Sequence, residues 1–209
     1  MMDYVRDPAE IYRQSFATIE REARLDEVPD DFRPLATRLI HACGMTDIVA
    51  DLRFSPDAMT KGRQALAAGA PVLTDVDSVR TGIIQRLLPA GNAVQCRISE
   101  AATAEAARGG ETTRAAAQMD LWGETIAGAV VAVGNAPTAL FRLLELIDGG
   151  SPKPALILGF PVGFVGAAES KAELAANPRG VPFVTLLGRR GGSAMAAAAV
   201  NAIAAGLAA

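Results

Sequence analysis

From residue 48 onward, short runs rich in valine, leucine and isoleucine alternate with longer segments whose apolar residues recur at helical spacing. Alternation of this kind is typical of a mainly parallel sheet covered by helices on both faces. The sequence therefore predicts a three-layer α/β/α fold with five to six strands. The expected strands are residues 48–53, 71–74, 93–98, 129–134, 155–159 and 182–187. The expected helices lie near residues 56–68, 76–87, 100–121, 137–148, 166–177 and 192–207.

An N-terminal helical segment is expected before the first strand. Asp7-Pro8-Ala9-Glu10 offers an N-cap aspartate, a proline at the first helical position and an early acidic residue, which together favour a helix start. A second helix follows Pro29-Asp30-Asp31 and should end near Gly44, because glycine suits the left-handed turn after a helix. No charge block or linker divides the 209 residues, so residues 1–209 are expected to form a single domain.

The composition argues against several classes of protein. A net charge of −3 and an isoelectric point near 5.3 argue against binding to nucleic acid, which usually requires a basic surface. No apolar run reaches the length of about 18 residues that a membrane-spanning helix needs. The N-terminus also lacks the pattern of a signal peptide, so a cytoplasmic protein is expected. The stretch 194–209 is apolar but rich in alanine, and we expect it to be a core helix.

Metal and nucleotide sites find no support in the sequence. The chain contains one histidine, His41, and two distant cysteines, Cys43 and Cys96, whereas most zinc sites need several such ligands. The glycine-rich patterns of nucleotide-binding loops and the GxSxG pattern of many hydrolases are absent. We therefore expect neither a metal nor a cofactor; a carboxylate site for magnesium stays open but has no motif behind it.

His41 and Ser15 are the first candidates for a functional role. His41 lies in the last turn of the second helix, where unpaired backbone carbonyls favour a positively charged imidazolium, as a proton donor requires. In an arbitrary protein, a histidine here more often caps the helix or faces solvent. Ser15 interrupts the apolar stripe of Ile11 and Ile19 on the first helix. It either bonds to the carbonyl four residues earlier, the commoner arrangement, or faces a ligand.

Loops at the carboxyl ends of the expected strands carry glycine and polar residues, and ligands bind at this edge of a parallel sheet. Asp75 follows the second strand, residues 134–138 follow the fourth and residues 159–163 follow the fifth. After the sixth strand, Gly188-Arg189-Arg190-Gly191-Gly192-Ser193 places two arginines and backbone amides just before a helix. This segment is either an anion site or an ordinary turn with solvated arginines.

Two charged positions stand out on the expected helices. Arg114 is a lone cation among alanines, and its guanidinium suits a carboxylate on a bulky partner. Glu169-Ser170-Lys171 is a candidate reactive group, but a charged, solvated helix face is the expected arrangement.

Several of these stretches together resemble the precorrin-8X methylmutase family, the precorrin isomerases of cobalamin biosynthesis. The most specific block is Pro161-Val162-Gly163-Phe164-Val165-Gly166, which runs into Glu169-Ser170-Lys171. The other blocks are Ile11-Tyr12-Arg13-Gln14-Ser15-Phe16 with Ile19, His41-Ala42-Cys43-Gly44 with Asp47-Ile48, Thr113-Arg114-Ala115-Ala116, Gly134-Asn135-Ala136-Pro137-Thr138, and residues 188–193. Together they span nearly the whole chain.

The resemblance implies a flavodoxin-like fold, a homodimer, and an isomerase that moves a methyl group from C-11 to C-12 of precorrin-8X, giving hydrogenobyrinic acid. It implies that His41 is the catalytic acid and that Ser15, Arg114 and Tyr12 lie in the substrate pocket. The tetrapyrrole carries many acetate and propionate carboxylates, so further arginines are candidates for binding it: Arg13, Arg189 and Arg190. The product is expected to pass to the next enzyme of the pathway.

Other functions remain compatible with the same residues. One is the methylmutase of the cobalt-early route, which acts on cobalt-precorrin-8. Another is a non-catalytic tetrapyrrole carrier on the same fold. A third is a phosphate or nucleotide binder that uses the turn at residues 188–193.

Overall fold

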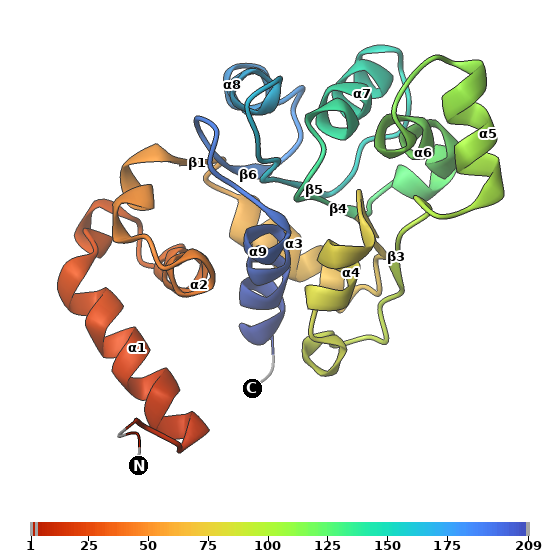
Figure 1. Ribbon diagram of the computed structural model, residues 1–209. Coiled ribbons are helices and arrows are strands. Elements are labelled where there is room, and N and C mark those ends of the chain that lie inside the picture. The colour runs from red at the N-terminus through yellow and green to blue at the C-terminus, as the bar shows by residue number, and fades with distance from the viewer. Residues whose placement is uncertain (1, 3, 208–209) are drawn as a thin grey trace.

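One sheet lies between two layers of helices in the computed structural model, which describes residue 2 and residues 4–207 (Figure 1). The strands are β1 (Leu52–Phe54), β2 (Val72–Thr74), β3 (Val94–Gln95), β4 (Val130–Val133), β5 (Leu156–Gly159) and β6 (Phe183–Leu186). The α-helices are α1 (Pro8–Glu22), α2 (Arg33–Cys43), α3 (Ala58–Ala67), α4 (Asp77–Gly82), α5 (Ala101–Gly109), α6 (Arg114–Trp122), α7 (Pro137–Asp148), α8 (Ala167–Ala176) and α9 (Ser193–Ala205). Short 3₁₀ helices complete the chain: η1 (Leu25–Glu27), η2 (Thr46–Asp51), η3 (Gln85–Leu87) and η4 (Gly123–Ile126).

The sheet is mainly parallel, as predicted. Its strand order is β1-β6-β5-β4-β2-β3, and each neighbouring pair is parallel except β1 and β6. In that antiparallel pair, Leu52 at the start of β1 lies opposite Leu186 at the end of β6. The predicted α/β fold class is therefore confirmed.

Alternate residues of the central strands point to opposite faces and build two hydrophobic cores. On one face, Val130 and Ala132 of β4 pack with side chains of α2, α3 and α9. On the other face, Val131 and Val133 pack with side chains of α6, α7 and α8. Every residue of β4 is buried, as expected for a parallel strand covered by helices on both sides.

The two N-terminal helices extend the fold beyond the three layers. α2 packs chiefly against α9, and α1 packs against α2 at the edge of the molecule (Figure 1). Within α1, Ile19 is the one buried residue, so most of this helix lies on the surface. The predicted N-terminal helical segment is confirmed.

Some predicted elements differ from those observed. Residues 48–51 belong to η2, and the strand begins only at Leu52. The single helix predicted over residues 100–121 is two helices, α5 and α6. The chain turns between them at Gly109 and Gly110 and at Glu111, whose φ of 48° is incompatible with a continuous helix.

Three further predicted elements are longer than the observed ones. The strand predicted at residues 93–98 has two residues, and the helix predicted at 76–87 ends at Gly82, before η3. The C-terminal helix ends at Ala205, and residues 208 and 209 of the predicted core stretch lie outside the described residues.

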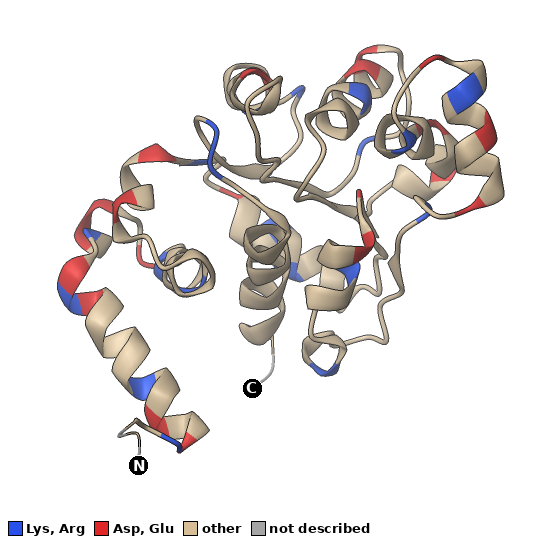
Figure 2. Cartoon of the chain, viewed as in Figure 1, with Lys and Arg blue, Asp and Glu red and all other residues tan. Residues whose placement is uncertain are grey.

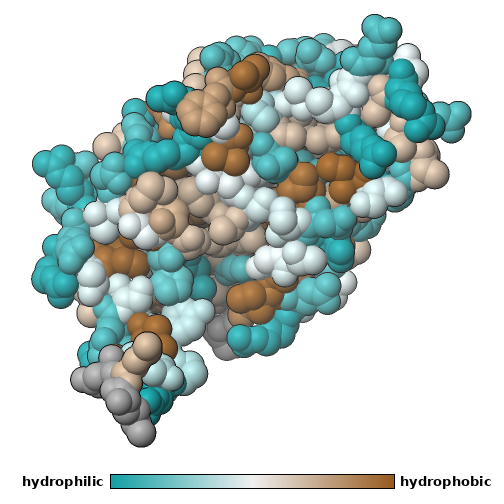
Figure 3. All heavy atoms as spheres, viewed as in Figure 1, coloured by the Kyte–Doolittle hydropathy of each residue, from teal (hydrophilic) through white to brown (hydrophobic). Residues whose placement is uncertain are grey.

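Large hydrophobic side chains reach the surface mainly near the N-terminus and in one loop. Phe164 and Val165, between β5 and α8, are 85% and 89% exposed. On the face seen in Figure 3, hydrophobic residues form separate small patches among hydrophilic ones. Within the part of the chain that the structure describes, no helix is both long and apolar enough to cross a membrane.

Candidate active site

His41 lies in the last turn of α2, where the sequence predicts it. α2 ends because Gly44 takes the left-handed conformation, with φ of 70°, and its N–H donates to the carbonyl of Ile40 at 2.7 Å. α1 begins at the predicted cap, where the Asp7 carboxylate accepts a hydrogen bond from the N–H of Ala9 at 2.9 Å. These caps set where α1 begins and where α2 ends.

Three side chains of α1 surround the imidazole. The Ser15 hydroxyl and Nδ1 of His41 are 2.8 Å apart and share a hydrogen bond. The Tyr12 ring stacks on the imidazole with 5.2 Å between ring centroids, and Phe16 meets it edge-on at 5.4 Å. We call Tyr12, Ser15, Phe16 and His41 the His41 cluster. Because Ser15 occupies Nδ1, Nε2 is the nitrogen that remains for a substrate.

The hydrogen bond to His41 bears on the commoner of the two interpretations of Ser15. The commoner arrangement, a bond from Ser15 to the carbonyl four residues earlier, is wrong here because the hydroxyl contacts the imidazole instead. Tyr12, Ser15 and Phe16 are three and four residues apart, so one face of α1 presents all three to His41.

Cavities open on two sides of His41. The first, of about 490 Å³, lies between α1 and the end of α2 and includes Ser15 and Thr46 in its lining. The second, of about 260 Å³, lies between α2 and α9. Alanines form most of the α9 wall of the second cavity, so a flat ring can approach closely there: Ala194, Ala197 and Ala198.

The arginines that the sequence singles out are spread over the molecule. Arg114 is the first residue of α6, which covers the face of the sheet opposite to α9. Arg13 pairs with Glu10 on α1, and the Arg189 guanidinium lies 5.3 Å from the centre of the Phe164 ring. Among the described residues, no hydrogen bond or ion pair joins these arginines to the His41 cluster. Ser15 and Tyr12 thus meet His41 in one chain, whereas Arg114 and Arg189 do not.

Arg190 belongs to a partly exposed charge network, and Lys171 is buried beside it. Lys171 is fully buried, and its Nζ donates to the backbone carbonyl of Arg190. The Arg190 guanidinium pairs with Asp47 and Asp51 of η2, each at 2.7 Å. Burial, together with the nearby Arg190 charge, lowers the pKa of Lys171 to about 8. The solvated helix face predicted at residues 169–171 is therefore wrong for Lys171, and Arg190 already has carboxylate partners within the chain.

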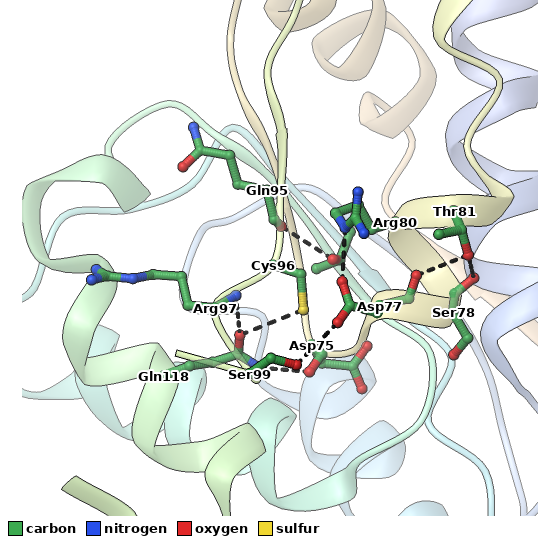
Figure 4. Close-up of polar contacts among 11 residues, drawn as sticks. Asp75, Asp77, Ser78, Arg80, Thr81, Gln95, Cys96, Arg97, Ser99 and Gln118 are labelled. Carbon is green, nitrogen blue, oxygen red and sulfur yellow. Dashed lines mark hydrogen bonds and ion pairs between the residues drawn. The ribbon is translucent and has the colours of Figure 1, made fainter. Parts of the chain in front are cut away.

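Asp75 lies at the carboxyl end of β2, as predicted, and its side chain is fully buried. Its carboxylate accepts hydrogen bonds from the backbone N–H groups of Gly134, Asn135 and Ala136, each at 2.8 Å. Burial raises the pKa of Asp75, and these three donors oppose that rise. The Gln118 side-chain amide donates to the Asp75 backbone carbonyl (Figure 4). Asp75 therefore fixes the loop that leads into α7.

The cysteines and acidic residues form no metal site in the part of the chain that is described. No three histidine, cysteine, aspartate or glutamate side chains there lie close enough to hold one ion. Cys43 and Cys96 are half-buried free thiols, and burial raises the pKa of each.

The sequence analysis missed one residue beside His41 and the burial of another residue. Arg38 lines the second cavity together with His41 and Tyr12. Its position one turn before His41 was a usable signal, because residues three apart share a helix face. Lys171 was noticed but its burial was not, because its hydrogen-bond partner is the distant Arg190.

Sequence comparisons with known proteins all find precorrin-8X or cobalt-precorrin-8 methylmutases. A family model described as precorrin-8X methylmutase matches residues 10–205. A precorrin-8X methylmutase from Pseudomonas aeruginosa is 60% identical over 204 residues, which cover 98% of each chain. One from a Sinorhizobium species is 52% identical, covering 97% of this chain and 96% of that protein. A cobalt-precorrin-8 methylmutase from Priestia megaterium is 40% identical, covering 94% of this chain and 87% of that protein.

Solved structures with a similar fold carry related names. A precorrin-8X methyl mutase from Thermus thermophilus superposes with a TM-score of 0.84 at 36% identity, covering 94% of both chains. A protein described as related to precorrin-8X methylmutase gives a TM-score of 0.81 at 28% identity, covering 90% of this chain and 98% of that one.

Proposed function

This chain belongs to the precorrin-8X methylmutase family, the isomerases of cobalamin biosynthesis, and we propose that it moves a methyl group from C-11 to C-12 of precorrin-8X to give hydrogenobyrinic acid. The observation that carries this proposal is the 60% identity with the Pseudomonas aeruginosa precorrin-8X methylmutase over 98% of both chains. The His41 cluster supplies a proton donor beside a cavity, as such a reaction needs.

We propose that the substrate is metal-free. The relatives named precorrin-8X methylmutase are 60% and 52% identical to this chain, whereas those named cobalt-precorrin-8 methylmutase are between 34% and 40% identical. The cobalt-containing substrate is the second candidate, and the 40% identity with the Priestia megaterium protein supports it.

In the proposed mechanism, protonated His41 donates a proton or a strong hydrogen bond from Nε2 to the macrocycle. This donation withdraws electron density from the ring and stabilises the charge that develops as the methyl group migrates. The reaction is an isomerisation, so the proton returns to His41 when the product forms. The Ser15 hydroxyl can donate or accept at Nδ1, so it holds the imidazole in both charge states.

The proposed pocket holds the ring so that C-12 and the migrating methyl group are aligned. Ser15 and Tyr12 would line it beside His41, and Arg13, Arg114, Arg189 and Arg190 remain candidates for binding the peripheral carboxylates. Of these, Arg190 is the weakest candidate because Asp47 and Asp51 already pair with it. We propose a cytoplasmic homodimer, in which a second subunit would bring such arginines to the substrate, and transfer of the product to the next enzyme.

The test is to mix a substoichiometric amount of protein with precorrin-8X and to follow the visible spectrum. Full conversion to the spectrum of hydrogenobyrinic acid supports the isomerase. Binding without conversion would indicate a carrier, and no binding would leave only a generic anion-binding role for residues 188–193. A parallel sample with cobalt-precorrin-8 compares the two substrates, and faster conversion of the cobalt compound would overturn the metal-free assignment.

A further inference from the structure

Arg63 of α3 is a half-buried arginine to which the fold gives no partner. Within the part of the chain that the structure describes, its Nε is buried without a hydrogen bond and its side chain forms no ion pair. Arg179, which is also half-buried, pairs with both Asp148 and Glu173. Because buried donors in proteins are nearly always bonded, an unpaired guanidinium in a cavity points to an anionic ligand.

Close packing sets where α3 presents this guanidinium. The neighbouring Gly62 lies so near β5 and α9 that a Cβ there would come within 2.8 Å of Leu156 and 3.1 Å of Ile203. The guanidinium of Arg63 in turn lies against the end of α9, where a Cβ on Gly206 would be 2.9 Å from Nε. The backbone of Gly206, with φ of −71°, would accept any residue. A side chain at residue 206 would therefore displace the guanidinium.

Arg63 lines a cavity of about 620 Å³ between α2, α3 and the end of α9. Arg33, in the same lining, pairs with Asp30 at 3.0 Å. The other charged residues of the lining are Arg38, Arg63 and Glu20, so the cavity carries a net positive charge. Such a cavity attracts an anionic group.

The larger cavity adjoins the cavity of about 260 Å³ that contains His41. The two share Arg38, and Asn201 of the smaller cavity is followed directly by Ala202 of the larger. We call the two cavities together the α9 groove, because α9 forms a wall of both. α9 carries no charged residue (Figure 2), and its wall consists mainly of alanines three or four positions apart on one helix face: Ala194, Ala197, Ala198, Ala202 and Ala205.

The α9 groove has a histidine at one end and a cation at the other. Ala194 lines the cavity of His41, and Ala205 lines the cavity of Arg63. These alanines are eleven residues apart, which is about 16 Å along a helix. A tetrapyrrole ring with its acetate and propionate side chains has a comparable length. A ring whose reacting edge contacts His41 can therefore reach Arg63 with a carboxylate on its opposite edge.

The cavity on the other side of His41 has the opposite character. Its lining includes Glu22 and Gln14 and no lysine or arginine. A ligand with several carboxylates is repelled by Glu22 on that side and attracted by the positive charge of the α9 groove. The charges therefore favour the α9 groove as the place of the ring.

Taking the proposed function as its premise, we propose that Arg63 binds a carboxylate on the edge of the tetrapyrrole that lies away from His41, so that the ring lies along the α9 groove. The guanidinium holds the carboxylate by charge-assisted hydrogen bonds. The ring is then fixed at two opposite edges, by His41 where the methyl group moves and by Arg63 at the far end. Arg63 is a substrate-binding residue and takes no part in the proton transfer.

The experiment is a titration of hydrogenobyrinic acid, followed by its visible spectrum, with wild type, Arg63→Gln and Lys61→Gln. Loss of the charge-assisted pair should weaken binding by about 10- to 100-fold in Arg63→Gln. Lys61→Gln is the matched control, because it removes the same charge from an exposed residue of α3 that faces away from Arg63. It should bind like the wild type.

A further variant moves the guanidinium without removing its charge. In Gly206→Ala the new methyl group would lie 2.9 Å from Nε of Arg63, so the guanidinium must shift. This variant should bind the acid more weakly than the wild type but more tightly than Arg63→Gln. Its free energy of unfolding in urea should not fall, because alanine suits the helical backbone of residue 206. Wild-type affinity in Gly206→Ala would overturn the inference that the guanidinium holds the carboxylate from this position.

A second probe separates recognition of the carboxylate from a structural role. Hydrogenobyrinic acid with its carboxylates converted to methyl esters should bind wild type and Arg63→Gln with nearly equal affinity. If Arg63→Gln binds the free acid as tightly as the wild type does, the inference is overturned. It is also overturned if the variant loses the same factor for acid and ester, since Arg63 then serves only the fold.

The outcomes also separate this inference from the proposed function. Wild-type protein that binds the product but does not convert precorrin-8X overturns the isomerase, and the titration still decides the role of Arg63. Wild-type protein that binds no tetrapyrrole overturns both. Conversion by the wild type together with unchanged binding by Arg63→Gln overturns the role of Arg63 alone.

Discussion

The replacement of Asp75 by asparagine should destabilise the fold far more than its position in a loop suggests. Oδ1 of Asp75 accepts the N–H of Gly134, and Oδ2 accepts those of Asn135 and Ala136, all at 2.8 Å. An asparagine has one acceptor oxygen, so in either orientation its NH₂ group faces at least one backbone donor. That donor and the new amide group are then buried without partners.

The expected cost follows from these contacts. A buried polar group without a partner costs about 1–3 kcal/mol, and the two groups together give a loss of about 2–4 kcal/mol in the free energy of unfolding. A small stabilising effect offsets part of this loss. Burial raises the pKa of Asp75 because it disfavours the charged carboxylate, and a neutral amide avoids that desolvation cost. For a chain of this length, such a loss lowers the melting temperature by about 5–15 °C.

The assay is urea unfolding of wild type, Asp75→Asn and Asp77→Asn. Asp77 is the matched control: its carboxylate is 45% exposed and pairs with Arg80 at 2.8 Å (Figure 4). An exposed pair of this kind contributes about 0–1 kcal/mol, so Asp77→Asn should stay close to the wild type. Equal unfolding midpoints for the two variants would refute the reasoning that the amide–carboxylate contacts of Asp75 stabilise this loop.

Two further predictions concern the site and the network beside it. Ser15→Ala should lower the rate of single-turnover isomerisation by about 10- to 100-fold, because a hydrogen bond to a charged group contributes about 1.5–3 kcal/mol. The control Ser15→Thr keeps the hydroxyl and should retain most of the rate. An unchanged rate in Ser15→Ala would contradict the role given to the bond between Ser15 and His41. Burial lowers the pKa of Lys171 to about 8, below its unfolded value of about 10.4, so the native state binds fewer protons in this window and the free energy of unfolding should rise as pH increases from about 8 to about 10. Urea unfolding of Lys171→Met across this range should show a smaller rise than the wild type, and parallel curves would contradict the lowered pKa of Lys171.

The elements that follow from local sequence signals were predicted well. The helix predicted at residues 137–148 is α7, with the proline at its first position and the apolar residues at helical spacing. The buried strands β4 and β5 are equally clear because continuous apolar runs of this length lie between glycines and turns. Residues 48–51 misled the prediction, since an apolar run of that length is compatible with a 3₁₀ turn as well as with a strand.

The sequence predicts those site residues whose side chain is unusual for its place in a helix. Ser15 and His41 stand out separately, and their contact requires only that α1 packs on the last turn of α2. The burial of Asp75 and Lys171 depends on partners about 60 and 20 residues away along the chain, which no local pattern reveals. Arg38 was overlooked because an arginine in a helix usually faces solvent. Its unpaired state is visible only once the surrounding helices are in place.

The measurement that tests the account most directly is the turnover of precorrin-8X by His41→Ala, made together with a titration of the product. General acid catalysis contributes about 10²- to 10⁴-fold, so the variant should lose activity by at least this factor. It should still bind hydrogenobyrinic acid within a few-fold of the wild-type affinity, because the arginines and the alanine wall remain. Isomerisation by His41→Ala at the wild-type rate would contradict the claim that this histidine is the acid.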